Sequence, residues 1–426
     1  MKSEYTLPLF ILIGLIVSCD STSPEDVVLL RTDSFSGSIA DHVESWVYIS
    51  NRNGQLLDLR KISEEEGVIE FEGVADDWVI VTEVSVASFD INGVTRLQHQ
   101  VTSYFGVPVG STYLVAESEP NQTTYPDTLG RASLQLNNYY ESNEPLFTIG
   151  FSDSYNSFNN WLDRANAVYD GSTLKADMIL RESPIDIFIS AYDGPEPVYK
   201  WLRNVEVGDD IVIDFEQFLP QKKVPINKPV TNAYIQGQIE PQLGGRGYEL
   251  SRSEYRSMSD TYAPSEIIEL GYVDGFEYYD TYAQAGPIYC CQPHEGVTYH
   301  KLGSSVPESI NLPDYEFVLN NGNLFELNYS FDRSFSQVNY YFADQGMNST
   351  FNWFIRVPDG IDLVVPAIPL EITAKYPFLD RDELSLSFVR FTEYLDGYSY
   401  QRFIRSRLER RPGRENFEVL EYYFQF

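Results

Sequence analysis

Cysteine is scarce in this chain of 426 residues, which holds only Cys19 and the adjacent pair Cys290 and Cys291. Adjacent cysteines can join only through a strained ring, pair between chains or stay reduced, so the sequence offers no disulfide framework. The fold must therefore be stabilised by packing. An apolar fraction of 43% and an aromatic fraction of 15% supply the side chains for several cores.

Signatures of catalysis are also missing. The sequence contains no Gly-x-Ser-x-Gly, no His-Glu-x-x-His and no glycine-rich phosphate loop. His42 and His99 stand alone in strand-rich stretches, where a packed or surface histidine is commoner than a catalytic base. We therefore expect binding or a structural role rather than catalysis. An exported glycoside hydrolase or other carbohydrate-active enzyme stays open as the alternative, because many of the 63 acidic side chains could converge in pairs.

Positive charge is sparse as well. Lysine and arginine number 30 against 63 acidic residues, which leaves a net charge of −33. Such a chain repels phosphate backbones, which argues against nucleic acid as a partner. Calcium binding is the more specific explanation of the many acidic residues. Asp209-Asp210 and the run from Asp380 to Glu383 could supply the oxygen ligands. Neither run has the spacing of a dedicated calcium loop, so we expect solvated turns and no bound cofactor.

Long hydrophobic runs are confined to the N-terminus. Lys2 precedes an apolar run from Leu7 to Val17, which has the length of a signal sequence and is too short to cross a bilayer. Ile16-Val17-Ser18-Cys19 closes the run with an aliphatic residue, two small residues and a cysteine. This pattern resembles the lipobox of bacterial lipoproteins, with an ordinary secretory signal or an uncleaved anchor as the alternatives.

The lipobox resemblance implies a signal peptide at 1–18, a lipid on Cys19 and an acidic tether at 19–26 that joins the protein to the membrane. An acidic run directly after the lipidated cysteine also resembles the surface-export signals of Bacteroidota lipoproteins. We expect a cell-envelope protein that is lipid-anchored in the outer membrane and displayed at the surface.

The first region after the tether has the pattern of short strands separated by turns. The β-rich segment Trp46 to Ile49 is followed by Asn53-Gly54, a step that favours a hairpin turn. From Val68 to Val74 apolar and acidic residues alternate, as in a strand with one buried face. These signals predict a β-sandwich domain at 27–119.

The second region combines strands with one predicted helix. Phe158, Trp161, Leu162, Ala165 and Val168 form a single apolar stripe at helical spacing, and Asp170-Gly171 would stop the helix. Strands are expected on its C-terminal side. This pattern predicts a β-sandwich domain at 130–220 with one amphipathic helix near 157–169.

The third region begins after a segment rich in lysine and proline at 221–229. Predicted strands are dense beyond Asn323 and continue to the last residue, so we expect Phe424 and Phe426 to be integral to the final sheet. The region is predicted as a C-terminal β-rich domain at 230–426. The fold class expected for the whole chain is mainly β.

One pattern recurs in the three regions. Val107-x-x-Gly110, Val205-x-x-Gly208 and Val357-x-x-Gly360 each place a glycine turn after a predicted strand end. Together with the Asn-Gly hairpin, this resembles the prealbumin-like and carboxypeptidase-regulatory-like β-sandwich modules of exported Bacteroidota proteins. The resemblance implies tandem sandwiches of immunoglobulin-like or prealbumin-like type, with a scaffold or binding role.

Tyrosine is abundant, with 31 residues, and it clusters at Tyr278, Tyr279, Tyr282 and Tyr289. Aromatic rings stack on the C–H groups of sugars, and tyrosine hydroxyls tolerate water, so an exposed row would form a glycan platform. Tyrosine is also common in any extracellular sheet. The expected partner is accordingly a glycan or an envelope protein.

Soft metal ligands gather at Cys290, Cys291 and His294, with His300 nearby. Thiolates and imidazoles at short spacing suit zinc, but the spacing matches no standard zinc module and exported thiols are usually oxidised. We expect an irregular loop, which a disulfide between the adjacent cysteines could close, rather than a metal site.

A concentration of arginines stands out near the C-terminus. Arg402, Arg405 and Arg407 alternate with apolar residues at a spacing that predicts a short helix with arginines on its exposed side. In so acidic a chain, the expected partner of this helix is the protein's own acidic surface, ahead of a polyanionic glycan or a lipid headgroup.

Overall fold

The computed structural model describes residues 27–33, 43–62, 68–74, 77–91, 94–113, 127–139, 149–154, 168–239, 247–254, 269–286, 295–346, 349–380, 384–408 and 416–426. These residues are mainly β, as predicted, with strands in six sheets and two α-helices. The strands are β1 (Val27–Asp33), β2 (Val43–Ser50), β3 (Leu56–Ile62), β4 (Val68–Gly73), β5 (Trp78–Ile91), β6 (Val94–Pro108), β7 (Ser111–Tyr113), β8 (Gly130–Asn137), β9 (Ile149–Asp153), β10 (Val168–Tyr169), β11 (Thr173–Leu180), β12 (Ile185–Asp193), β13 (Glu196–Val205), β14 (Asp210–Asp214), β15 (Leu219–Pro220), β16 (Lys222–Pro225), β17 (Asn232–Gln238), β18 (Gly247–Glu254), β19 (Glu269–Tyr272), β20 (Tyr278–Ala285), β21 (Glu295–Gly303), β22 (Phe317–Asn321), β23 (Asn328–Phe331), β24 (Gln337–Gln345), β25 (Ser349–Pro358), β26 (Ser385–Tyr394) and β27 (Phe417–Gln425). The helices are α1 (Leu370–Thr373) and α2 (Tyr400–Leu408), with 3-10 turns η1 (Phe215–Gln217), η2 (Leu324–Glu326) and η3 (Pro377–Leu379).

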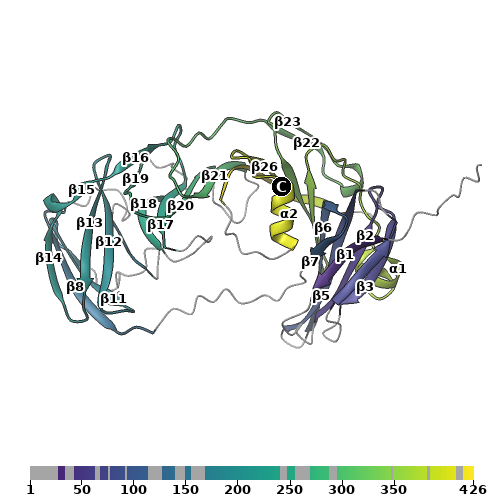
Figure 1. Ribbon diagram of the computed structural model, residues 1–426, viewed down its shortest axis with the longest axis horizontal. Coiled ribbons are helices and arrows are strands. Elements are labelled where there is room, and N and C mark those ends of the chain that lie inside the picture. Colours follow the sequence, from purple (N-terminus) through teal and green to yellow (C-terminus); the bar gives the residue numbers. More distant parts are fainter. Residues whose placement is uncertain are drawn as a thin grey trace, which may run out of the picture.

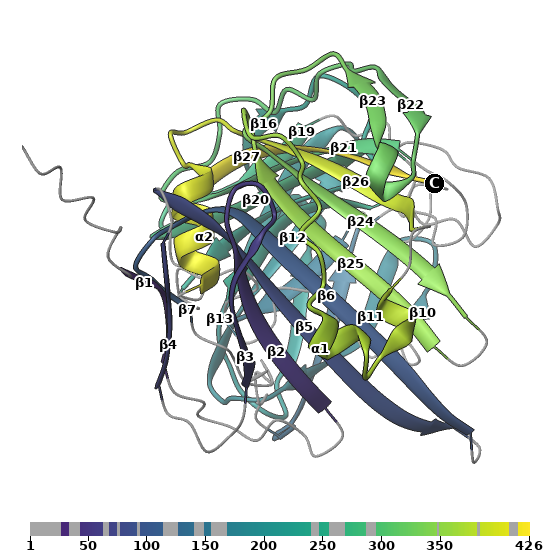
Figure 2. The same cartoon turned by 90° about the vertical axis from the view of Figure 1, so that its right-hand side faces the viewer.

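A twelve-stranded sheet organises the molecule. Its order is β18-β17-β20-β21-β27-β26-β24-β25-β6-β5-β2-β3, and every neighbouring pair is antiparallel except β25 and β6. Figure 2 shows β24, β25, β6, β5 and β2 side by side across this junction. The parallel pair joins strands that lie some 250 residues apart in the chain, for example at Trp353 and Val101.

One face of this sheet is the main core. Along β24 and β25 every second side chain is fully or almost fully buried, as at Phe342, Trp353 and Ile355. Most of the residues between them are only half-buried, although Gln337 at the start of β24 is 3% exposed. Helix α1, η3 and the β22–β23 hairpin supply the apolar residues that close this face, including Ile372 and Phe317. Strict alternation of this kind is what a sheet with one buried face requires.

The three-stranded sheet β4-β1-β7 covers one end of the opposite face. Leu29, Leu30 and Phe71 from this small sheet pack on Val47 and Val81 of the large one, and α2 closes the same core from the side. The predicted region 27–119 thus has two layers. Its larger layer does not end with the region, because β6 pairs onward with β25 of the predicted C-terminal domain.

The predicted region 130–220 forms its own two-layer unit, on the left in Figure 1. The sheets β10-β11-β8-β14 and β15-β13-β12-β9 enclose one apolar core, which includes Leu136, Phe151 and Ile189. Most of the predicted helix near 157–169 lies outside the described residues. The last two positions of that range, Val168 and Tyr169, belong to strand β10 instead, paired with β11.

Local turns follow the sequence signals closely. Asn51 accepts hydrogen bonds on its side chain from the backbone N–H groups of Asn53 and Gln55, and Gly54 adopts φ of 78°, so β2 and β3 form the expected hairpin. The glycines of the recurring pattern also turn with positive φ: 80° at Gly110, 92° at Gly208 and 78° at Gly360. The strand expected after the turn forms at the first two, as β7 and β14, but not after Gly360.

The end of the chain is partly as expected. Phe424 lies in β27, is 2% exposed and stacks on Phe317 with ring centroids 4.2 Å apart. Phe426 follows the strand and is 44% exposed, so only the first of the two aromatics is integral to the core.

Candidate functional site

The predicted tyrosine platform is divided between two faces of the sheet. Successive side chains of β20 point to opposite faces, so Tyr279 turns into the core, where it is 5% exposed and donates to the carbonyl of Val273. Tyr278 and Tyr282 stand on the other face and are half-buried. Tyr279 is therefore removed from any exposed row, and Tyr289 lies outside the described residues.

Tyr282 belongs to a polar cluster at one end of this second face. Its ring stacks on Tyr234 of β17, with centroids 5.3 Å apart, and its hydroxyl donates to Gln284 Oε1 at 2.9 Å. Burial raises the pKa of Tyr234 and Tyr282, so both phenols stay neutral hydrogen-bonding groups. Nearby, His300 Nε2 lies 2.8 Å from Asp280 Oδ1, an aspartate that is almost fully buried.

The metal and calcium candidates are not assembled into sites within the described residues. Cys290, Cys291 and His294 lie outside them, and His300 is paired with an aspartate. Asp209 accepts from the backbone N–H of Glu206 and closes a turn. Across the described part of the chain, no three His, Cys, Asp or Glu side chains gather as metal ligands would. Asp380 follows η3, and 381–383 fall outside the described ranges.

The second face of the twelve-stranded sheet, named the polar face below, changes character along its length. Where the small sheet covers it, its side chains are mainly apolar, as at Val47, Val81 and Val107, although Glu83 there accepts from Tyr113 of β7. Beyond that cover, on β25, β24, β26 and β27, the same face carries arginine, asparagine, tyrosine and glutamate. These side chains are mostly half-buried, so this part of the face is accessible to a ligand.

Five of these residues stand in line across five adjacent strands. The pairing registers place Tyr423 opposite Arg390, Arg390 opposite Asn339, Asn339 opposite Arg356, and Arg356 opposite Tyr104. Neighbours in such a line are within side-chain contact distance. We call this Tyr-Arg-Asn-Arg-Tyr line the arginine row.

The two arginines of the row are held in different ways. Arg390 Nη1 lies 3.5 Å from Glu421 Oε2, and its side chain is 40% exposed. The guanidinium of Arg356 lies over the rings of Tyr104 and Phe403, 5.4 Å from each centroid. Contact with two aromatic rings orients a planar cation without neutralising its charge. The row therefore holds two oriented guanidinium groups.

Two buried polar atoms of the row have no hydrogen-bond partner: Asn339 Oδ1 and Arg390 Nε. They belong to directly opposite residues on β24 and β26. Buried polar groups are usually hydrogen-bonded, so these two atoms are unusual, although neither is exposed to solvent.

A second line of side chains runs beside the arginine row, two residues further along each strand. Phe388, Tyr341 and Phe354 stand opposite one another on β26, β24 and β25. The rings of Tyr341 and Phe354 stack with centroids 4.7 Å apart, and Tyr341 donates to Asn352 Oδ1 at 2.8 Å, which fixes its ring. These three aromatic residues, the aromatic row, are all half-buried.

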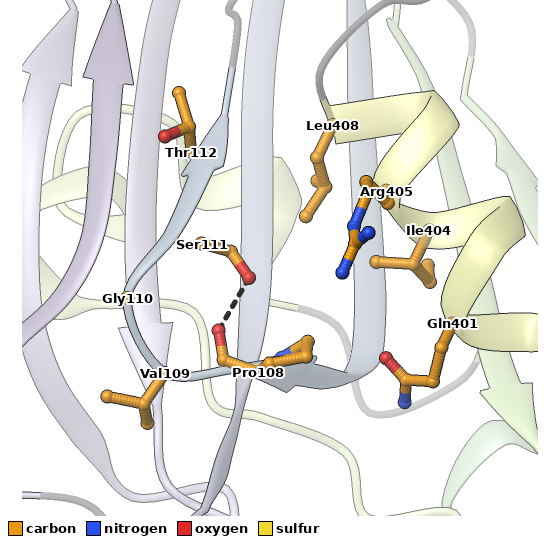
Figure 3. Close-up of a pocket in the computed structure, with 9 residues that line it drawn as sticks. All are labelled: Pro108, Val109, Gly110, Ser111, Thr112, Gln401, Ile404, Arg405 and Leu408. Atoms are coloured by element: carbon orange, nitrogen blue, oxygen red, sulfur yellow. Dashed lines mark hydrogen bonds between the residues drawn. The ribbon is translucent and has the colours of Figure 1, made fainter.

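A cavity of about 330 Å³ lies between α2 and the turn that joins β6 to β7. Figure 3 shows Ile404, Arg405 and Leu408 extending from α2 toward this turn. Two of its polar side chains already bond to the protein: Gln401 donates to the carbonyl of Gly106, and Ser111 to that of Pro108. The cavity adjoins the polar face, but it presents fewer polar side chains to a ligand than the two rows do.

The sequence did not reveal the two rows. Their residues lie in five strands between positions 104 and 423, and only the strand order and register bring them together. The available signal was the alternation within each strand, which separates Asn339 and Tyr341 from the core residues but does not identify their neighbours.

Comparisons with protein-family models, with curated proteins and with solved structures find no match to this chain. Among the helices described, none combines the length and the apolar character needed to span a membrane.

Proposed function

We propose that this protein is an exported, lipid-anchored binding protein of the cell envelope that holds a glycan on its polar face without cleaving it. The observation that carries the proposal is the aromatic row beside the arginine row, on the accessible part of the face. Sugar rings stack on aromatic faces through their C–H groups, and their hydroxyls need charged or amide partners, which the two rows supply together.

Membrane attachment rests on the N-terminal sequence. The run that ends in Ile16-Val17-Ser18-Cys19 supports a lipid on Cys19, with residues 19–26 as the tether to the first strand at Val27. We further propose a Bacteroidota-type surface lipoprotein whose 130–220 region is a prealbumin-like module. The two four-stranded sheets around one core support that assignment.

A binding role is favoured over hydrolysis by the carboxylates of the polar face. Asp280 lies against His300, and Glu421 accepts from Thr392 and faces Arg390. A glycosidase needs two carboxyl groups that face the scissile bond together, whereas each of these two is already engaged by side chains of the protein.

The test uses the soluble form, residues 25–426, in native gels that contain one polysaccharide each, with and without calcium. We expect selective retardation by a glycan, and Phe388→Ala should weaken it roughly three- to tenfold by removing one stacking face. Phe325→Ala is the matched control, because Phe325 is an exposed phenylalanine on η2, outside the polar face. Retardation that survives Phe388→Ala unchanged, or release of new reducing ends from the polymer, would contradict the proposal.

A further inference from the structure

A buried chain of hydrogen bonds crosses the parallel junction between β6 and β25, two strands that Figure 2 shows side by side. The indole Nε1–H of Trp353 on β25 donates to the Ser103 hydroxyl of β6 at 3.0 Å, and Ser103 Oγ lies 2.9 Å from Thr82 Oγ1 on β5. Ser103 and Thr82 are fully buried, and Trp353 is 3% exposed. We infer that the bond between Ser103 and Trp353 sets the register of β6 and β25, and with it the alignment of the two rows on the polar face.

The register of this strand pair has to be specified by side chains. Strands β5 and β6 are consecutive and antiparallel, and so are β24 and β25, so the short connection within each pair limits its register. Strands β6 and β25 come from segments some 250 residues apart in the chain. No short connection therefore aligns one of these two hairpins with the other.

A slip of two residues is the arrangement that competes with the native one. A slip of one residue would turn Arg356 into the core, which is costly for a charged group. A slip of two residues keeps every side chain on its own face, and the backbone hydrogen bonds of a parallel pair are evenly spaced and repeat at that interval. It would place Ile355 opposite Phe105 or Val101 instead of Ser103, so apolar packing discriminates poorly between these registers.

The native register gives the buried indole an acceptor, and the slipped registers do not. Trp353 stands opposite Val101 and reaches the next core-facing residue of β6, which is Ser103. After a slip in either direction the same reach would end at Phe105 or Val101, whose side chains cannot accept. An indole N–H can only donate, and a donor left unpaired in a core is costly. This bond therefore distinguishes registers that packing does not.

Other polar contacts across the junction are less selective, because they end on the backbone. His99 Nδ1 lies 3.0 Å from the carbonyl oxygen of Thr350. The Tyr400 hydroxyl donates to the carbonyls of Phe105 and Arg356. Every residue has a carbonyl, so a slipped strand would present another one. A side-chain acceptor at one position of an apolar strand face has no such substitute, and fixing register is the best-attested role of buried polar groups.

The alignment of the polar face follows from the same register. It places Arg356 opposite Tyr104, with the guanidinium 5.4 Å from the ring centroid. A slip of two residues would set Arg356 opposite Gly106 or Thr102 and would break the arginine row at β6. Ser103 is thus a positioning residue for the polar face, although its own side chain lies in the core. This inference does not rest on the proposed function, because the register can be measured without a ligand.

The experiment measures the register with pairs of cysteines in the soluble form, residues 25–426. Gln100→Cys is combined with Asn352→Cys, which lies directly opposite in the native register, or with Thr350→Cys or Phe354→Cys, which would lie opposite after a slip of two residues. In the native register the last two positions are diagonal to residue 100, about 8 Å away, which is too far for a disulfide. The protein is refolded under reducing conditions and oxidised, and peptide mapping identifies the cross-links.

With the native core, we expect cross-linking between residues 100 and 352. Ser103→Ala should raise the ratio of slipped to native cross-links by about tenfold, because the native register then loses its hydrogen-bond advantage. Trp353→Phe removes the donor instead of the acceptor and should have the same effect, so it also serves if Ser103→Ala does not fold.

The matched control is Thr82→Val. It removes a hydroxyl that is as buried as that of Ser103, but the lost hydrogen bond lies within the β5–β6 pair. Thr82→Val should lower the melting temperature without raising the slipped cross-links. A change of register is thereby separated from a loss of stability.

Each outcome decides the inference. Slipped cross-links with Ser103→Ala and Trp353→Phe, but not with Thr82→Val, would support it. Native cross-links alone in all three variants would overturn it, because packing and the backbone contacts would then suffice to set the register. Slipped cross-links with Thr82→Val as well would also overturn it, because any loss of stability would then be enough to shift the strand.

Discussion

The two faces of the twelve-stranded sheet are made by the same strands and have opposite properties. On β25, Phe351, Trp353 and Ile355 point into the core and are at most 3% exposed. Asn352, Phe354 and Arg356 alternate with them on the polar face and are half-buried. Residues that stabilise the fold and residues that we expect to meet a ligand are thus one position apart, so a register slip of one residue would exchange them.

A second contrast lies within the polar face itself. Under the β4-β1-β7 sheet its side chains are mainly aliphatic, with Glu83 accepting from Tyr113 of β7, and beyond that cover they become arginine, asparagine and tyrosine. A face that merely lacked a cover would still carry apolar residues and would expose a large hydrophobic patch. The change of chemistry at the edge of the cover indicates that the open part is not a surface for a further apolar layer.

The largest predicted effect is a difference in stability between alanine variants of two phenylalanines on β26. Phe391 is fully buried in the main core, so Phe391→Ala should lower the free energy of unfolding by about 3–5 kcal/mol. Phe388→Ala, on the polar face of the same strand, should cost about 1 kcal/mol or less. Urea denaturation of both variants measures the difference. Similar losses in the two would mean that the polar face is also a packed core.

A smaller effect is expected where α2 meets the sheet. Tyr400 is 5% exposed, and its hydroxyl donates to the carbonyls of Phe105 at 2.7 Å and Arg356 at 3.1 Å. Tyr400→Phe should lower the free energy of unfolding by about 1 kcal/mol, because those buried carbonyls lose a donor. Tyr278→Phe, at a half-buried position of the polar face, is the matched control and should change stability less. Equal changes would show that this bond does not hold α2 on the sheet.

Local pattern predicted much of the secondary structure. Alternation at 68–74 buries Ile69 and Phe71 in β4, and the Asn-Gly step forms the β2–β3 hairpin. The arginine-rich segment forms helix α2, with Arg402 and Arg405 exposed as predicted. These successes share one cause: the information lies within about ten neighbouring residues, where strand and helix periods differ.

The site could not be predicted because it is a property of long-range pairing. No local signal specifies that β6 runs parallel to β25, and that pairing alone brings Tyr104 beside Arg356. The tyrosine cluster shows the same limit from the other side. Tyr278 and Tyr279 are neighbours in the sequence but lie on opposite faces of the sheet, because successive side chains of a strand point to opposite sides.

Low pH should reduce the stability of the fold through His99, whose side chain lies on the core face. This histidine is 1% exposed, its ring stacks on Phe378, and its Nδ1 lies 3.0 Å from the carbonyl oxygen of Thr350. Burial lowers its pKa, against that hydrogen bond, so the folded state prefers the neutral ring. Above the ordinary pKa of 6.5 the ring is neutral in both states. As the pH falls below it, the unfolded chain takes up the proton first and stability declines.

The measurement is urea denaturation of the wild type and His99→Phe at pH 8 and pH 5. The variant loses the hydrogen bond at both values, but its stability should fall less between them, because it has no ring to protonate. An unchanged pH dependence would show that other groups, chiefly carboxylates, account for the acid sensitivity.

The smallest effect is expected at the rim of the core face, where charge is exposed rather than buried. Lys375 Nζ lies 2.6 Å from both carboxylate oxygens of Glu44, the hydroxyl of Tyr376 donates to the same group, and Lys61 is 3.5 Å away. Burial acts to raise the pKa of Glu44, but the hydrogen bonds from Lys375 and Tyr376 and the charge of Lys61 outweigh it and lower that pKa. The carboxylate therefore adds stability above its ordinary value of 4.5, and this is lost as the pH falls below it.

Glu44→Gln should consequently lower the free energy of unfolding at pH 7 by about 1 kcal/mol or less, since exposed ion pairs are screened by water and salt. The deficit should shrink at 1 M salt, where charges interact only over about 3 Å, and at pH 3, where the wild-type carboxyl is increasingly protonated. Lys375→Gln should show the same salt dependence, because it removes the other half of the pair. A deficit that persisted at pH 3 and in high salt would mean that Glu44 stabilises the rim through packing rather than through its charge.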